Sequence, residues 1–450
     1  MSAWLIKNAL LVNEGREREA DLRIAGERIE EIGSGLAARA GEQVIEAHGR
    51  WLLPGMIDDQ VHFREPGLTH KGDLASESAA AVAGGVTSIM DMPNTRPPTL
   101  DAAALEDKYQ RAAGRCRANY GFYLGASNDN IEAIRALDPK TAPGIKVFMG
   151  ASTGNMLVND PETLDRIFRD APTPIITHCE DTPMIEAAMA AAKAQYGEAI
   201  PITLHPDIRS RQACLKSSEL AVSLAKKHGT RLHVLHISTA DELALFEPGP
   251  LLDAQGRVQK RITAETCVHF LHFAREDYAR LGSLIQCNPA IKDASDREAL
   301  IDALRDDRID VLATDHAPHT LEEKQQPYPR SPSGLPLVQD VVLATLELVH
   351  RRRISLAKAV QKICHAPAQL FDVAERGFLR EGCFADLVLI DPRASHTVER
   401  SQVLSRCGWS PFEGTRFSSR IDATFVNGEL VWDGARLIGA ANGQRLVFAR

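Results

Sequence analysis

The stretch PGMIDDQVHFREPG, residues 54–67, decides the fold. Its first half reads as a short strand that follows a Pro-Gly turn, and it ends in the ionisable side chains of His62 and Arg64. Strands that end in such side chains are typical of parallel βα architectures, in which the carboxyl ends of the strands meet and form a site. We therefore expect similar strands further along the chain.

Between about residue 50 and residue 320, short β-rich runs come before polar clusters and are followed by helical stretches, as in βα units. Helical spacing of apolar residues is found at 74–83, 131–137, 212–227 and 297–305. The candidate strands end at 58–62, 88–92, 122–125, 145–149, 175–178, 232–236, 263–266 and 311–315. The pattern predicts an α/β fold with a (β/α)8, TIM-like barrel over residues 54–378.

The two ends of the chain read differently from the middle. Residues 1–53 alternate apolar and polar side chains and carry turn signals at Gly26 and Gly49. Residues 379–450 alternate in the same way, through the final run GQRLVFAR, and Asn427-Gly428 is a typical hairpin turn. We expect the two ends to pair into one small, discontinuous β-sandwich domain beside the barrel.

Composition excludes several classes of function. The 450 residues are 44% hydrophobic, which is enough for a large core, and no apolar run approaches the length of a membrane span. A net charge of −8 gives no support for nucleic-acid binding. The eight cysteines form no C-x-x-C pair, and the N-terminus lacks a signal-peptide pattern. These features favour a soluble, cytoplasmic protein with reduced thiols.

Five ionisable side chains lie at the ends of five different candidate strands. Any one of them could simply be a hydrogen-bonded residue, but five nitrogen and oxygen donors at one barrel mouth are hard to assign to packing. Imidazole and carboxylate groups suit zinc, and zinc can activate a water for amide hydrolysis. The candidate metal ligands are His62, Lys146, His178, His236 and Asp315.

The motifs around these residues resemble those of the amidohydrolase superfamily, and more narrowly those of the dihydroorotase family. Besides the stretch at 54–67, they are MPNT at 92–95, GIKVFMGASTGNMLV at 144–158, HISTADEL at 236–243, NPAIKD at 288–293 and TDHAPHTLEEK at 314–324. The resemblance covers nearly the whole chain. It implies reversible, zinc-dependent hydrolysis of dihydroorotate to N-carbamoyl-aspartate, a step of pyrimidine synthesis.

The resemblance also implies roles for the five ligands. His62 would bind the more buried zinc ion, and His178 with His236 would bind the second. Lys146 would carry a carboxyl group from carbon dioxide and bridge the metals, since an ammonium group has no lone pair to donate. Asp315 would contact the first metal and also carry the proton from the attacking water to the departing nitrogen.

A pocket for the substrate carboxylate follows from Arg64, because a planar guanidinium matches a carboxylate. By resemblance, Asn94 and His319 complete this pocket, while Asn288 and the loop backbone at 332–335 hold the pyrimidine edge. The remaining histidines at 70, 233, 269, 272 and 316 are expected to pack or form hydrogen bonds. Two-residue alternation predicts that His233 points to the face opposite His236.

One position departs from the family pattern: Gln60 stands where the first histidine of an H-x-H pair is expected. An amide oxygen is a poorer zinc donor than imidazole. Three outcomes are open: Gln60 ligates weakly, the first metal is held without it, or only the site of His178 and His236 is filled. One or two zinc ions per chain are therefore expected, and by resemblance a homodimer.

Two other functions compete with this interpretation. The chain could be another cyclic amidohydrolase, such as an allantoinase, hydantoinase or dihydropyrimidinase, but those substrates lack the ring carboxylate that Arg64 would bind. It could also be a catalytically silent, structural relative of dihydroorotase. Gln60 alone favours the silent subunit, since the other ligands are all present.

Overall fold

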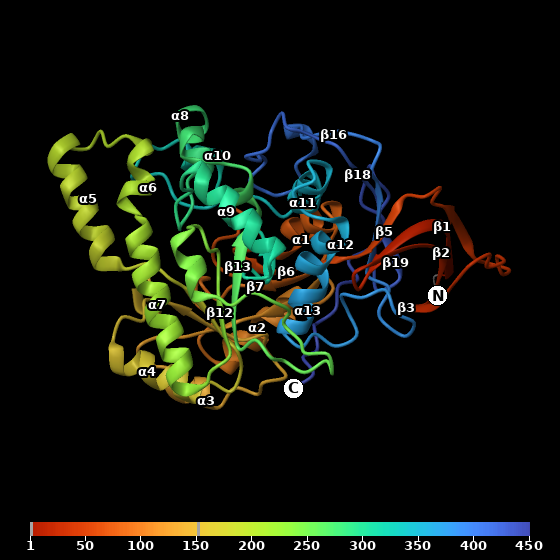
Figure 1. Ribbon diagram of the computed structural model, residues 1–450, viewed down its shortest axis with the longest axis horizontal. Helices are drawn as coiled ribbons and strands as arrows, with labels where there is room; N and C mark the ends of the chain where they lie inside the picture. Colours follow the sequence, from red (N-terminus) through yellow and green to blue (C-terminus); the bar gives the residue numbers. More distant parts are fainter. Residues whose placement is uncertain (1–2, 151–153) are drawn as a thin grey trace.

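The computed structural model describes residues 3–150 and 154–450, so part of the motif at 144–158 lies outside the described residues. The parallel strands of a barrel lie in the middle of the molecule among surrounding helices (Figure 1), and the predicted fold class is confirmed. Its strands are β6 (Met56–Val61), β7 (Val86–Asp91), β8 (Asn119–Phe122), β9 (Leu124–Gly125), β10 (Ile145–Phe148), β11 (Ile175–His178), β12 (Leu232–Val234), β13 (Ile262–Cys267) and β14 (Val311–Ala313).

The barrel is closed between its first and last strands. β8 and β9 are two parts of one strand, interrupted at Tyr123, because β8 pairs with β7 and β9 pairs with β10. Val61 forms a parallel bridge with His316, and the His62 N–H donates to the His316 carbonyl at 2.7 Å. The eight strand positions predicted from sequence are therefore all occupied, and their carboxyl ends meet at one mouth.

Helices surround the barrel, and four of them match the predicted segments to within three residues. α9 begins three residues earlier than predicted because Asp293 and Asp296 form a capping box there. The helices are α1 (Leu74–Ala83), α2 (Ala102–Ala112), α3 (Ile131–Arg135), α4 (Pro161–Asp170), α5 (Thr182–Tyr196), α6 (His205–Ile208), α7 (Arg211–His228), α8 (Tyr278–Leu281), α9 (Ala294–Arg305), α10 (Leu321–Lys324), α11 (Val341–His350), α12 (Leu356–Val360) and α13 (Ala366–Leu370).

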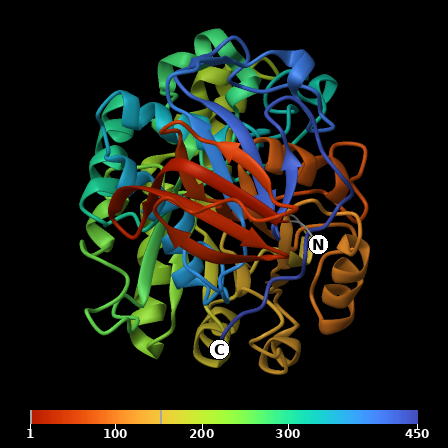
Figure 2. The same cartoon turned by 90° about the vertical axis from the view of Figure 1, so that its right-hand side faces the viewer.

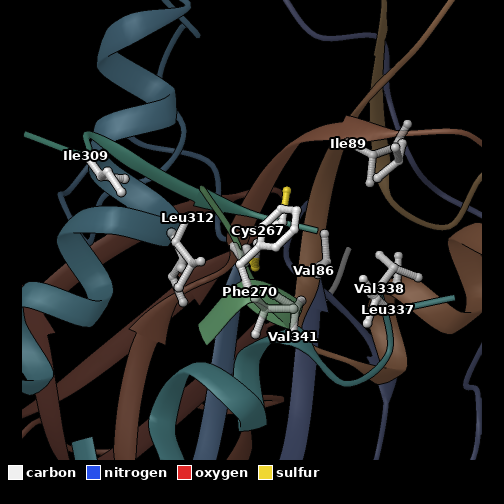
Figure 3. Close-up of a cluster of buried hydrophobic side chains, with 14 of the residues drawn as sticks. Val86, Ile89, Cys267, Phe270, Ile309, Leu312, Leu337, Val338 and Val341 are labelled. Carbon is white, nitrogen blue, oxygen red and sulfur yellow. The ribbon is translucent and has the colours of Figure 1, made fainter. Parts of the chain in front are cut away.

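The main core lies between the barrel strands and these helices. Figure 3 shows part of it, where Val86 of β7, Leu312 of β14 and Val341 of α11 come together. All three side chains are fully buried. Each such aliphatic side chain stabilises the fold by roughly 1.5–3 kcal/mol, so this layer holds the strand ends, and the side chains on them, in fixed positions.

Strands from both ends of the chain form one sheet beside the barrel (Figure 2). Trp4 and Phe425, from opposite ends, pack edge to face with ring centres 5.3 Å apart. Asn427 and Gly428 both have positive φ, as the predicted hairpin turn between β18 and β19 requires. The strands are β1 (Ala3–Asn13), β2 (Arg16–Ala25), β3 (Arg28–Gly33), β4 (Gln43–Glu46), β5 (Trp51–Pro54), β15 (Leu387–Asp391), β18 (Arg420–Val426) and β19 (Glu429–Trp432).

The last residues of the chain do not join this sheet, although their alternation assigns them to it. Leu446 N–H donates to the carbonyl of Tyr120 in the barrel at 2.9 Å, and Phe448 bridges to Val373. Leu446 and Phe448 are buried in a cluster with Ile57 and other residues of the barrel interior. The expectation that the small domain runs through residue 450 is wrong for this segment, because its apolar side chains are buried against the barrel instead.

In the described residues, no helix combines the length and the apolar character needed to cross a membrane.

Candidate active site

The structure brings the five predicted metal ligands together at the barrel mouth. Lys146 lies within β10 and His178 ends β11, while His62, His236 and Asp315 each follow the end of a strand. Burial lowers the pKa of His236, and the charges of His178, Asp315 and Lys146 also act on this imidazole. Residues up to 253 positions apart are thus neighbours, as in the contact between His62 and Asp315.

The first ligand pair is His178 and His236. His178 Nδ1 lies 2.9 Å from His236 Nε2, and its Nε2 lies 2.9 Å from the carboxylate of Glu180. Because that carboxylate accepts the Nε2 proton, His178 Nδ1 presents a lone pair toward His236. Burial lowers the pKa of both imidazoles, which keeps them neutral and able to bind a metal.

Glu180 contacts a candidate ligand and was not identified by the sequence interpretation. It is fully buried, pairs with Arg209 and orients His178. Burial opposes its ionisation, but Arg209 and His178 together lower its pKa to about 2. Its position two residues after a candidate ligand is the only signal in the sequence, and the spacing is too common to be decisive.

The second pair is His62 and Asp315, whose Nε2 and Oδ1 atoms lie 3.1 Å apart. His62 Nδ1 lies 2.8 Å from Asn94 Oδ1, which has only lone pairs to offer, so Nδ1 donates to that oxygen and Nε2 is the nitrogen that faces the carboxylate. Burial opposes ionisation of Asp315, but the hydrogen bond and charge of His62 lower its pKa to about 2. A ring nitrogen and an ionised carboxylate that face each other can together hold a cation in place of the Nε2 proton.

Lys146 is buried without a counter-ion. No carboxylate of residues 3–150 and 154–450 forms an ion pair with its amino group, which lies 4.7 Å from the centre of the Phe148 ring. Burial lowers the pKa of Lys146 to about 8. A larger fraction of the amine is therefore neutral near pH 7 than for a free lysine, and the neutral amine is the nucleophilic form.

Gln60 faces the second pair through its nitrogen. Its Nε2 donates to Asp315 Oδ1 at 2.9 Å, and its Oε1 lies 3.9 Å from Cys267 Sγ. In this arrangement the amide oxygen, the only atom of Gln60 that could bind a metal, is directed away from Asp315.

The residues expected to hold the substrate carboxylate line the same mouth. Arg64 is buried, donates from Nε to the Pro318 carbonyl at 3.0 Å, and its Nη2 lies 3.1 Å from His319. Lys71, which sequence did not single out, lies with its amino group 2.9 Å from His319 Nδ1. Asn94, bound to His62 through its oxygen, keeps its NH2 group for a ligand. Lys71 is paired with Glu323 at 3.0 Å, so Arg64 is the cation that this pocket offers beside the candidate metal ligands.

The opposite side of the mouth contains Asn288 and the proline-rich loop. The Asn288 side-chain oxygen is buried and has no hydrogen-bond partner among the described residues, as expected of an atom that awaits a ligand. Lys324 donates to the carbonyls of Gln286, Pro332 and Gly334, at 3.1, 2.8 and 3.0 Å. This buried ammonium fixes the backbone of the loop at 332–335.

Three of the eleven non-glycine residues with positive φ in the described part of the chain lie at this mouth. Arg64, His236 and Asp315 have φ values of 68°, 41° and 52°, in the left-handed region that side chains other than glycine rarely adopt. Such strain persists where the surrounding structure requires it, and it clusters at functional sites. The left-handed turns aim these three side chains into the barrel mouth.

His233 forms a hydrogen bond as expected, with Thr263, but the predicted direction of its side chain is wrong. Its Nε2 lies 3.3 Å from Asp59 of β6, a strand on the other side of the barrel, so His233 points into the barrel interior and not away from the site. His236 follows β12 in a left-handed conformation, which breaks the two-residue alternation on which the prediction depended. Other histidines behave as expected: His316 pairs with Glu77 at 2.9 Å, and His272 bonds to the Ala344 carbonyl.

The chain is similar to known proteins in both sequence and fold. The sequence model of the amidohydrolase family matches residues 51–431. The dihydroorotase of Halobacterium salinarum is 34% identical over 434 residues, covering 96% of each chain, and that of Pyrococcus abyssi is 31% identical, covering 89% and 88%. Among solved structures, the L-hydantoinase (dihydropyrimidinase) of Arthrobacter aurescens superposes with a TM-score of 0.92 at 27% identity, covering 99% and 100%.

A barrel with ionisable ligands converging on its mouth defines a hydrolase of the amidohydrolase class, which acts on cyclic amide bonds. The chain belongs to the amidohydrolase family and, within it, to the dihydroorotases.

Proposed function

We propose that the protein is a zinc-dependent dihydroorotase that reversibly hydrolyses (S)-dihydroorotate to N-carbamoyl-L-aspartate in pyrimidine synthesis. The observation that carries the proposal is Arg64, a buried guanidinium whose charge interacts with that of Asp315. A cation in this position can form an ion pair with the substrate if the cyclic amide carries a carboxylate. Dihydroorotate does, whereas allantoin, hydantoin and dihydrouracil do not.

The residues at the mouth fit one or two zinc ions. His178 with His236 would hold one, and His62 with Asp315 would hold the other, with Lys146 N-carboxylated between them. Facing donor atoms 2.9 and 3.1 Å apart are close to the roughly 3.3 Å that separates ligand atoms around tetrahedral zinc. We further propose that Gln60 does not ligate, since its nitrogen is directed at Asp315.

Zinc, when bound, supplies a Lewis acid that polarises the ring carbonyl and makes water a nucleophile near neutral pH. Arg64, Asn94 and His319 hold the substrate carboxylate, and Asn288 with the loop at 332–335 holds the ring edge. Asp315, ionised and beside the ligands, accepts the proton of the attacking water. It then passes this proton to the ring nitrogen as the amide bond breaks.

Parallel assays of the purified, zinc-loaded protein on dihydroorotate, allantoin, hydantoin and dihydrouracil test the proposal. We expect kcat/KM for dihydroorotate to exceed the others by a factor of about 10³ or more, because a site built for a charged group rejects analogues that lack it. Preference for a substrate without a carboxylate would contradict the proposal. Absence of turnover on all four would instead favour a silent structural subunit.

Replacement of Arg64 by methionine should lower kcat/KM for dihydroorotate by about 100-fold or more, since charged hydrogen bonds contribute about 1.5–3 kcal/mol each. Steady-state kinetics with N-carbamoyl-aspartate and dihydroorotate would measure the loss. Arg117→Met is a matched control, because that guanidinium binds the carbonyls of Ile438 and Gly439 away from the mouth. Equal kinetics for the two variants would remove Arg64 from the substrate pocket.

Replacement of Gln60 by histidine should tighten zinc binding at the mouth by at least about tenfold, because imidazole replaces an amide that does not ligate. Competition with a chromophoric chelator measures the affinity. Weaker binding in Gln60→His would instead mean that the native amide already contributes to coordination.

We also propose that the enzyme is cytoplasmic and forms a homodimer. Light scattering on the purified protein tests the oligomeric state, and a monomeric mass at micromolar concentration would rule the dimer out.

A further inference from the structure

A second cluster of ligand-type side chains lies inside the barrel, apart from the mouth. It consists of Asp59 of β6, His233 of β12 and Glu265 of β13. One ligand atom from each lies within 4.8 Å of the others, and all three side chains are without exposed surface. Phe371 closes the other side, with its ring centre 5.8 Å from that of His233.

The cluster is not held together by hydrogen bonds. Both side-chain oxygens of Asp59, Nε2 of His233 and Oε2 of Glu265 are buried without a hydrogen-bond partner among the described residues. His233 Nε2 lies 3.3 Å from Asp59 Oδ2 and 3.7 Å from Glu265 Oε2. These separations bracket the roughly 3.4 Å expected between ligand atoms of a tetrahedral ion with bonds near 2.1 Å.

The hydrogen bonds around His233 fix which of its nitrogens carries the proton. Its Nδ1 lies 2.8 Å from Thr263 Oγ1, and that hydroxyl donates its only proton to the Leu232 carbonyl at 3.1 Å. Nδ1 must therefore be the donor to Thr263, which leaves Nε2 as the nitrogen that faces the two carboxylates and that a metal ion would bind in place of a proton. A histidine whose other nitrogen donates to a fixed acceptor is the usual arrangement of a metal ligand.

Charge leads to the same conclusion. Two carboxylates buried together are strongly unfavourable. Burial opposes protonation of His233, but the hydrogen bonds and charges of Asp59 and Glu265 raise its pKa to about 9, so without a metal one imidazolium offsets only one of the two carboxylate charges. A divalent ion beside two carboxylates and a neutral imidazole makes the cluster neutral. Oxygen and imidazole ligands suit first-row ions such as Zn²⁺ or Mn²⁺.

The cluster is distinct from the proposed catalytic ligands but touches them. Glu265 uses its other oxygen, Oε1, to accept the backbone N–H of His236 at 3.2 Å. An ion bound by Glu265 would therefore stabilise the strand end that presents His236 to the mouth.

We propose that Asp59, His233 and Glu265 bind a divalent transition-metal ion, a buried structural site separate from the catalytic centre. The ion would enter during folding, because the cluster has no exposed surface.

The test is an anomalous difference map of wild-type crystals grown from zinc-loaded protein, recorded at the zinc absorption edge. The expected result is a peak bonded to His233 Nε2 and to oxygens of Asp59 and Glu265, in addition to density at the mouth. Zinc at the mouth together with no peak between these three residues would overturn the proposal, since protons alone would then balance the cluster.

Elemental analysis of variants gives an independent readout. Asp59→Asn and Glu265→Gln should each lose about one zinc per chain relative to wild type, whereas His178→Ala should lose zinc only from the mouth and keep the buried peak. Thr263→Val keeps the side-chain shape and should weaken the buried site about 10–100-fold by removing the acceptor for Nδ1. Unchanged zinc content in folded Asp59→Asn and Glu265→Gln proteins would also overturn the proposal.

Discussion

The Asp315→Asn protein should fold normally and show kcat for dihydroorotate reduced by about 10³-fold or more, the upper part of the range for loss of general acid–base catalysis. Asparagine keeps the shape of the side chain and can still accept hydrogen bonds from Gln60 and His62. It cannot take up the proton of the attacking water. Since the carboxyl pKa of about 2 keeps Asp315 ionised at neutral pH, the native enzyme has this base fully available.

Steady-state kinetics in both directions, with circular dichroism to check folding, measure the effect. Asp340→Asn is a suitable control, because Asp340 is also a buried carboxylate but hydrogen-bonds to Ser410 instead of facing the metal ligands. A folded Asp315→Asn enzyme with near-normal kcat would exclude the proton-transfer role.

The Lys146→Ala protein should lose zinc from the mouth and show kcat lowered by about 10⁴-fold, equivalent to about 5 kcal/mol of lost transition-state stabilisation. The reason is that Lys146, once carboxylated, would supply the negative charge between the two ligand pairs. Zinc quantification and turnover on the same sample measure both effects.

Two further measurements separate the role of Lys146 from a packing effect. Acetate or propionate added to Lys146→Ala should partly restore activity, because a small carboxylate can replace the carbamate. Lys362→Ala is the matched control: Lys362 is as buried as Lys146 but pairs with Asp307, so its loss should reduce stability and leave zinc content unchanged. Native zinc and turnover in Lys146→Ala would reject the bridging role.

Much of the fold could be predicted because the barrel strands carry strong local signals. Most of the barrel strands are short, buried runs rich in apolar residues, and α1 spans the residues that its periodicity predicts. The final segment could not be predicted in the same way. Its alternation is equally compatible with the small sheet, and only the burial of Leu446 and Phe448 against the barrel interior determines where it lies.

The residues that form the candidate site could be predicted from the sequence, but the hydrogen bonds that support them could not. Four of the five candidate ligands lie at or just after strand ends and Lys146 lies within β10, and the barrel topology brings all five to one mouth. Glu180 and Lys324 act through hydrogen bonds whose partners are fixed only by the folded loops. His233 was assigned to the wrong face because the left-handed backbone at His236 interrupts the strand periodicity. Local pattern rules fail at such strained positions, which also tend to be functional.

Dihydroorotate hydrolysis before and after removal of the accessible metal tests the central claim most directly. A chelator should abolish turnover of the purified enzyme, and added Zn²⁺ should restore it as the mouth site fills. A folded protein that hydrolyses dihydroorotate equally well with and without accessible metal, or that fails to hydrolyse it when zinc-loaded, would contradict a zinc centre built from His62, Lys146, His178, His236 and Asp315.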